Sequence, residues 1–200
     1  LLEINQLTYN DVFVNDPIHL NDIQPVLNDS SYWKKGDVFL SIKHLSLVVH
    51  YRPSTSKIIN LIKGPFYMQH DVDIISDHEI SIFNNNLKIT PNGLQLFNAE
   101  VIIYDFVSKK FKKKFNKSLL DHDVQSRGQG ISEILKDGSM MIEEENGRIL
   151  FFNSSGKLEW EFINKARNNK TYIFNWSRII QNKKLIKNIK RKIQNSSCSN

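Results

Sequence analysis

The sequence predicts an all-β fold, and three observations support this class. Short runs with alternating apolar residues recur along the chain, as in "DVFLSIKHLSLVVHYR", "EISIFNNN" and "EVIIYDF". Turn-forming stretches such as "KKGD", "PNG", "KDGS" and "SSGK" separate these runs, as hairpins require. Helical periodicity is scarce before about residue 180. The local pattern therefore favours consecutive antiparallel hairpins.

The composition fits a folded domain. The 200 residues are 40% hydrophobic, which is enough to bury a core and excludes disorder for most of the chain. No run reaches the ~18 apolar residues of a membrane-spanning helix, and no signal peptide is visible. Because the chain begins at Leu1, we expect it to belong to a longer protein, for which these absences say little. The lone Cys198 excludes an internal disulfide framework.

The formal net charge of +6 comes mainly from two basic runs, at residues 109–117 and 183–192. The first run reads as a strand at a sheet edge or as a hairpin, with Phe111 and Phe115 as its apolar face. The second predicts an amphipathic helix within a basic tail, residues 181–200, with an apolar stripe formed by Leu185, Ile186, Ile189 and Ile193. Such a helix could bind an anionic membrane or RNA. Basic runs usually face water, so we expect a solvated helix packed on the body and no nucleic acid partner.

Three segments of the chain, at 19–44, 70–85 and 130–145, can be aligned as a repeat. The alignment superposes three sets of residues: His19 with His70 and Gly130, Asp22 with Asp73 and Glu133, and His44 with Asn84 and Glu144. An insertion, "LKITPNGLQLFNA", lengthens the middle unit. The spacing is typical of the blades of a β-propeller, in which four-stranded sheets surround a central channel. We expect a partial propeller over residues 1–180, with blades at about 17–64, 65–118 and 126–165 and a further piece at 171–180 that opens a fourth blade or completes a ring.

The repeat also predicts a candidate site. An inner strand begins near the rim of the channel, so His19 and His70 should point into a shared funnel, with His44 at the far end of the first hairpin. Imidazoles that meet in a polar funnel suit nucleophilic and acid–base catalysis near pH 7. An anionic substrate would also need a cation, for which Lys88, Arg127 and Arg178 are candidates.

Structural roles compete with these functional ones. Each histidine could simply be a satisfied polar group, and Asp22, Asp73 and Glu133 could accept backbone hydrogen bonds. Asparagines 84–86 could bind ligand oxygens or form a left-handed turn. Three histidines with Asp71 or Asp73 could hold zinc, but no H-x-x-x-H spacing supports this, so no metal is expected. We expect Trp160 and Phe162 to be core residues between blades. The sequence has no nucleophile elbow, P-loop or dinucleotide fingerprint.

Four stretches together resemble the arylsulfotransferase (aryl sulfate sulfotransferase-like) family: "HLNDIQP" (19–25) and residues 33–59, 64–86 and 132–164. The resemblance implies a six-bladed propeller and PAPS-independent transfer of a sulfuryl group from an aryl sulfate to a phenol, with no cofactor. It also implies a transiently sulfurylated histidine, helped by other histidines and by an arginine that holds the sulfuryl oxygens. His19 and His70 match the family's "H-x-N" and "Q-H-D" positions, and His44 matches a basic residue–histidine pair.

Two positions depart from the family pattern. Gly130 stands where a third histidine would complete the ring, and Leu87-Lys88 stands where an arginine is expected. Lys88 or Arg127 would have to substitute for that arginine, with Asn21 and Asn84 as further substrate-binding residues. The resemblance implies a periplasmic, extracellular or membrane-anchored protein, with membrane association through sequence upstream of Leu1. The oligomeric state is not indicated.

Two hypotheses follow. In the first, the protein is a sulfuryl transferase in which His70 is the nucleophile and His19 the acid–base partner, although the residues do not decide between these two assignments. In the second, the protein is a non-catalytic propeller that binds a ligand or a protein in its funnel, which Gly130 favours. The fold class expected in both cases is a partial β-propeller of three to four blades followed by a C-terminal amphipathic helix.

Overall fold

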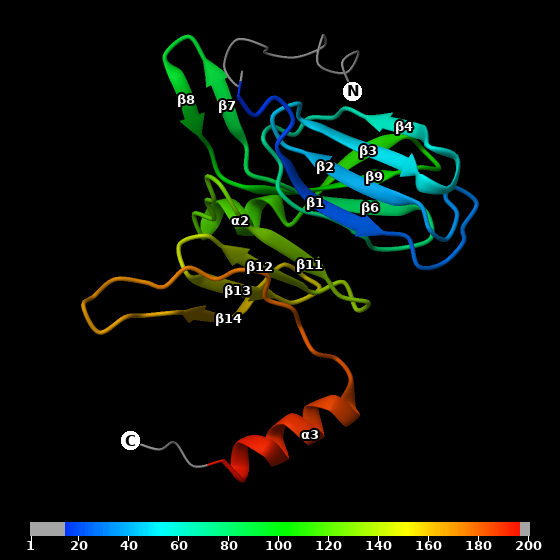
Figure 1. Ribbon diagram of the computed structural model, residues 1–200. Helices are drawn as coiled ribbons and strands as arrows, with labels where there is room; N and C mark the ends of the chain where they lie inside the picture. The colour runs from blue at the N-terminus through cyan, green and yellow to red at the C-terminus, as the bar shows by residue number, and fades with distance from the viewer. Residues whose placement is uncertain (1–14, 197–200) are drawn as a thin grey trace.

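The structure is a computed structural model, which describes residues 15–196. Within this range, three four-stranded antiparallel sheets and one two-stranded hairpin make up nearly all the regular structure (Figure 1). The first two sheets lie side by side, and the third lies next to the second. No helix in the described part of the chain is long and apolar enough to cross a membrane.

Each sheet is a simple succession of hairpins. The first contains β1 (Leu20–Pro25), β2 (Val38–Ile42), β3 (Leu47–Arg52) and β4 (Lys57–Ile62), with a short 3₁₀ helix at Pro53–Thr55. The second contains β5 (Val72–Ile74), β6 (Glu79–Asn84), β9 (Glu100–Asp105) and β10 (Lys110–Lys114). The third contains β11 (Ile131–Ile134), β12 (Met140–Glu144), β13 (Arg148–Phe152) and β14 (Leu158–Ile163). The insertion in the second unit forms a separate hairpin from β7 (Leu87–Thr90) and β8 (Gly93–Leu96).

The strand register repeats from sheet to sheet. Asp22 pairs with Ser41, Asp73 with Ser81, and Glu133 with Met141, each time between the first and second strands. His44, Asn84 and Glu144 each lie three residues beyond these partners, so they occupy equivalent positions. The alignment drawn from the sequence therefore agrees with the backbone at the end of the second strand.

A β-bulge breaks this equivalence at the start of the first strand. The register of β1 shifts between Leu20 and Asp22, so Asn21 is an extra residue. As a result the Lys43 N–H donates to the His19 carbonyl at 3.0 Å, whereas the equivalent Phe83 N–H donates to the Asp71 carbonyl at 3.0 Å. His19 therefore occupies the backbone position of Asp71, one residue out of step with His70. The equivalence of His19 and His70 drawn from the sequence is wrong by this one residue.

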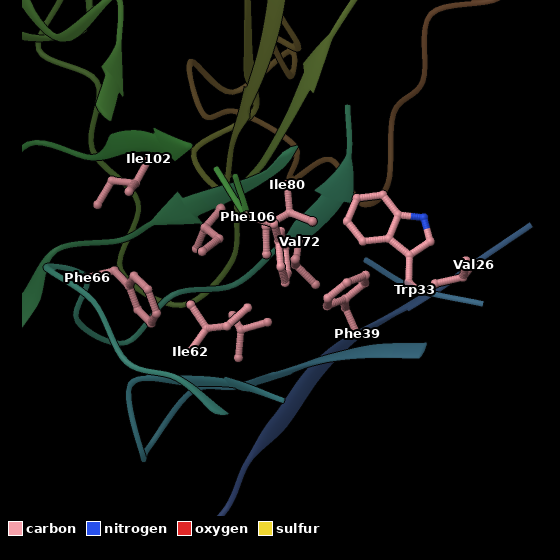
Figure 2. Packing of buried hydrophobic residues seen from close by; sticks show 11 residues of the cluster. Val26, Trp33, Phe39, Ile62, Phe66, Val72, Ile80, Ile102 and Phe106 are labelled. Atoms are coloured by element: carbon pink, nitrogen blue, oxygen red, sulfur yellow. The ribbon is translucent and has the colours of Figure 1, made fainter. Parts of the chain in front are cut away.

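The first two sheets are joined by a buried apolar cluster (Figure 2). Trp33 packs edge-on against Phe39 and Phe106, with ring centroids 5.6 and 5.3 Å apart. Further members come from both sheets and their connections: Val26, Val48, Ile62, Phe66, Val72, Ile80, Ile82 and Ile102. Burial of this apolar surface is the main force that fixes one sheet against the next.

A second cluster joins the second and third sheets, with Phe83, Leu119 and Phe152 among its buried members. Leu119 lies on α2 (Asn116–Asp121), a six-residue helix that the sequence pattern did not predict. A helix this short has too few residues to show a 3.6-residue apolar period, which explains the omission.

Two further expectations concern the third sheet and the segment that follows it. Trp160 and Phe162 are 42% and 51% exposed, so their prediction as core residues is wrong. Both lie on β14, the outermost strand, where Trp160 stacks on Phe151 of β13 and the Phe162 ring lies 5.7 Å from that of Phe174. Residues 172–180 contain no regular strand and run in extended form beside the third sheet.

The basic C-terminal run forms α3 (Lys183–Gln194), as its apolar spacing predicted. Asn182 caps the helix because its side chain accepts a hydrogen bond from the Leu185 N–H at 3.0 Å. The fold class predicted from the sequence, propeller-type sheets followed by an amphipathic helix, is confirmed.

Candidate active site

Two histidines stand together where β1 begins and β2 ends. The rings of His19 and His44 are stacked, with centroids 4.6 Å apart and an interplanar angle of 30°. They meet because the ladder between the first two strands continues past the regular sheet, through His44 N–H to the Ile18 carbonyl at 3.3 Å. Both side chains are half-buried. The structure thus brings together two of the three histidines that the sequence singled out.

Asp16 orients both rings. Its carboxylate is hydrogen-bonded to Nδ1 of His19, and this bond is the main cause that lowers the pKa of Asp16. An ionised carboxylate can only accept, so Nδ1 of His19 is the donor in this bond. Nδ1 of His44 lies 2.5 Å from the Asp16 carbonyl oxygen, which fixes the same tautomer there. Burial lowers the pKa of His44, so its ring is neutral near pH 7.

Lys43 places a cation beside these rings. Its side chain is buried, and Nζ donates to the Gly128 carbonyl at 3.3 Å. Burial lowers its pKa, while the negative charges of Glu145 and Asp16 raise it. Glu145 in turn accepts from the backbone N–H groups of Gly128 and Gln129 at 2.5 and 2.9 Å. The loop before β11 therefore holds the ammonium in place from the third sheet.

Gln69 fixes the turn that carries Lys43 and His44. It is fully buried, and its Nε2 donates to the carbonyls of Ile42 and Leu47 at 3.1 and 3.0 Å. The bulged Asn21 reaches back in the other direction, donating to the Gln69 carbonyl at 3.1 Å. Gln69, in the segment that leads into the second sheet, thus fixes the backbone that carries the histidines of the first sheet. Asn21, predicted to bind substrate, makes this bond between blades.

His70 lies deeper than the other two imidazoles. Burial is the main cause that lowers its pKa to about 4, and the charges of Lys43 and His19 act in the same direction. Its Nδ1 is buried without a hydrogen-bond partner among the described residues, and its ring lies 6.1 Å from the Trp176 ring. His70 is therefore a neutral, half-buried imidazole whose Nδ1 is shielded from solvent.

Below these histidines the inner strands carry acids. Asp22 accepts from the Val72 N–H, Asp71 from the Ser132 N–H and Glu133 from the Ile179 N–H, at 3.1, 3.1 and 2.8 Å. The prediction that such acids accept backbone hydrogen bonds is confirmed for Asp22 and Glu133.

Asp73 stands apart from this hydrogen-bonding scheme. Burial raises the pKa of Asp73 to about 6, opposed by the charge of Arg178. Arg178, one of the cations considered from the sequence, thus interacts electrostatically with Asp73. Its guanidinium also lies 5.5 Å from the Trp176 ring.

The other residues predicted to bind substrate lie in different settings. Asn84 is fully buried, accepting from the N–H groups of Tyr67 and Asn86 and donating to Glu100 at 3.1 Å. Lys88 stands over the Tyr67 and Phe97 rings at 4.8 and 5.0 Å, and Arg127 is exposed. Their role in substrate binding stays a prediction, whereas the charge of Lys43 acts on both His44 and His70.

Two trios of side chains in the described residues have ligand atoms within 4.8 Å of one another and could hold a metal ion. They are Asp16 with His19 and His44, and His78 with Glu79 and Asp105. In the first trio Asp16 and His19 already satisfy each other by hydrogen bonding. Neither trio includes Asp71 or Asp73, the acids that the sequence offered for a zinc site.

Sequence reasoning missed Asp16, Lys43, Gln69 and Glu145. Lys43 stands in "SIKH", directly before His44, and Asp16 precedes His19 by three residues. Both therefore had a local signal in the sequence. Gln69 stands next to His70 in the "Q-H-D" stretch, but its role, like that of Glu145, depends on contacts across sheets that no local pattern shows.

No curated protein matches this chain. Among solved structures, the chain is similar to the WD40 β-propeller domain of Doa1, with 9% identity, a TM-score of 0.47 and coverage of 75% of this chain and 45% of that one. U3-55K is similar at 10% identity and a TM-score of 0.38, with coverage of 60% and 31%. The chain thus spans less than half of either structure. The profile of the arylsulfotransferase (ASST) family matches residues 3–165, and the chain therefore belongs to this family.

Proposed function

We propose that this protein transfers a sulfuryl group from an aryl sulfate to a phenol through a sulfurylated histidine, and that His19 is that histidine. The observation that carries the proposal is the stacked His19–His44 pair, oriented by Asp16 and flanked by the buried Lys43. This assignment moves the nucleophile from His70 to His19 and the acid–base role to His44. It does so because burial lowers the pKa of His70 to about 4 and leaves its Nδ1 buried, while the His19 side chain is 39% exposed.

The chemistry follows from the tautomers. The Nε2 lone pair of His19 attacks sulfur, an N–S bond forms, and the S–O bond to the aryl group breaks to release a phenolate. The ring becomes cationic, and the Asp16 carboxylate at Nδ1 stabilises this charge. In the second step His44 takes the proton of the acceptor phenol as its oxygen attacks sulfur, and the N–S bond breaks. No cofactor is needed for either step.

Lys43 supports the same reaction electrostatically. A sulfuryl group in transfer carries negative charge on its oxygens, and an ammonium in a partly buried site stabilises such charge more strongly than one in bulk water. Lysine provides a point charge rather than the planar fork of an arginine. A site with lysine in this position would therefore restrict the orientation of the sulfuryl oxygens less than a site with arginine.

The test uses the full-length protein with 4-nitrophenyl sulfate as donor and phenol as acceptor. We expect release of nitrophenolate, a loss of at least about 100-fold in kcat/KM for His19→Ala, and a loss of about 10-fold for Lys43→Gln. His78→Ala is the matched control, because His78 lies in the turn between β5 and β6 and pairs with Asp77. Mass spectrometry of the quenched enzyme should place one sulfuryl group on the peptide that contains His19. Undiminished activity of His19→Ala would refute the assignment.

The second candidate function is a propeller that binds an aryl sulfate or similar ligand without turnover, and Gly130 is the observation that favours it. Gly130 has φ +106°, and a Cβ there would lie 2.5 Å from the Phe83 ring. No histidine can therefore complete the ring of imidazoles at this position. Binding of 4-nitrophenyl sulfate by calorimetry, with no nitrophenolate release by the wild-type protein, would favour this function over transfer.

A further inference from the structure

The C-terminal helix α3 has an apolar face that nothing in the described structure covers. None of its residues is buried, and it stands apart from the three sheets at the end of an extended connection (Figure 1). Leu185, Ile186, Ile189 and Ile193 share one face because they are separated by one, three and four residues. Leu185 and Ile193 are 46% and 66% exposed. The expectation that this helix packs on the body is therefore wrong.

The rest of the helix carries charge of a single sign. Six of its twelve residues are cations and none is an acid: Lys183, Lys184, Lys187, Lys190, Arg191 and Lys192. Lys183 faces Lys187, and Lys187 faces Arg191, at the four-residue spacing where like charges destabilise a helix. A helix of this length is marginal in water even without such repulsion. The Asn182 cap favours the helix but leaves this repulsion in place.

We propose that α3 binds the surface of an anionic phospholipid bilayer and lies in its plane. The apolar stripe would enter the boundary between headgroups and acyl chains, and the flanking cations would meet the lipid phosphates and carboxylates. Each Lys or Arg near such a surface contributes about a fivefold gain in binding, corresponding to ~1 kcal/mol. This inference is independent of sulfuryl transfer.

A bilayer fits this helix better than a nucleic acid does. Binding to RNA or DNA uses the cations but leaves the apolar face in water. An anionic bilayer engages both faces and removes the like-charge repulsion along the helix. The helix is also too short and too charged to cross a membrane, so it lies on the surface.

The experiment is flotation of the full-length protein with vesicles of phosphatidylcholine alone or mixed with phosphatidylserine. We expect flotation with the mixed vesicles only, and a fall in binding as salt rises. Ile186→Gln/Ile189→Gln keeps the charge and the helix propensity but removes two stripe residues, and should weaken binding at least about tenfold. Lys187→Gln/Lys190→Gln should weaken it about 10- to 30-fold. Lys110→Gln/Lys112→Gln, on the edge strand β10, makes the same charge change and should leave binding unchanged.

Three outcomes would overturn the proposal. The first is equal binding to both kinds of vesicle, and the second is no binding to either. The third is binding to single-stranded RNA that survives Ile186→Gln/Ile189→Gln, together with vesicle binding that this variant does not weaken. Circular dichroism of the two variants without vesicles checks that the sheets remain folded.

Discussion

At the scale of single residues, burial assigns different chemistry to three imidazoles that share one region. His19 is held by a carboxylate, His44 is neutral and held by a backbone carbonyl, and His70 has a buried Nδ1 and a pKa lowered to about 4. A histidine kept neutral by burial avoids placing a second cation beside Lys43. It also makes folding sensitive to pH, because the unfolded chain binds the proton more readily than the folded one.

This gives a prediction for His70. Its pKa falls from 6.5 to about 4 on folding, so the unfolded state takes up a proton between these values and the folded state does not. The free energy of unfolding should therefore decrease as pH falls from about 6.5 to about 4, by at most ~3 kcal/mol. Urea unfolding of wild type and His70→Gln at pH 7 and pH 4.5 measures it, with the variant losing less between the two pH values. Because Asp73 shifts in the opposite sense, only the difference between the two proteins isolates His70. Parallel pH profiles would contradict the prediction.

At the scale of elements, the site is built by contacts that pass from one sheet to the next. A carboxylate on or beside each inner strand accepts a backbone N–H from the segment that follows, and Gln69 holds the turn between β2 and β3. The "Q-H-D" stretch thus has three separate functions: Gln69 fixes the neighbouring turn, His70 lines the site, and Asp71 ties the second sheet to the third.

Gln69→Leu tests this role. The substitution removes both donors to the Ile42 and Leu47 carbonyls in a fully buried position, so it should lower the free energy of unfolding by about 1–3 kcal/mol. It should also lower kcat more than it changes KM, because Lys43 and His44 lose their fixed position rather than their identity. Gln95→Leu on the exposed β8 is the matched control. Full activity of Gln69→Leu would show that the turn holds its shape without this side chain.

At the scale of the whole molecule, two apolar clusters make the three sheets one cooperative unit, and α3 stands outside it. The second sheet contributes to both clusters, so a defect in either interface should be felt across all three sheets. The C-terminal helix shares no buried residue with them.

Removing residues 183–200 should accordingly change the free energy of unfolding by less than about 0.5 kcal/mol. Phe39→Ala, at a fully buried position in the first cluster, should cost about 3–5 kcal/mol and shift the unfolding of the whole body in one transition. Urea unfolding followed by tryptophan fluorescence compares the two. A large loss on removing the helix would mean that α3 belongs to the cooperative core.

The sequence by itself determined the strands, the hairpins, the repeating unit, the edge strand β10 and the amphipathic helix. These depend on local alternation, turn residues and helical spacing, which neighbouring residues specify. It also carried the family, because the stretches around His19 and His70 are specific enough in combination.

Only the tertiary structure decided the site. The bulge at Asn21 moved His19 against His44, and the Gln69 bonds brought Lys43 beside them. Burial lowered the pKa of His70 to about 4 and so gave it a role different from that of the pair. Likewise, nothing local distinguished Trp160, which is 42% exposed on an outer strand, from an aromatic residue in a core. In each case the deciding contact joins residues far apart in the chain, and the energy of that contact depends on burial, which a local pattern does not specify.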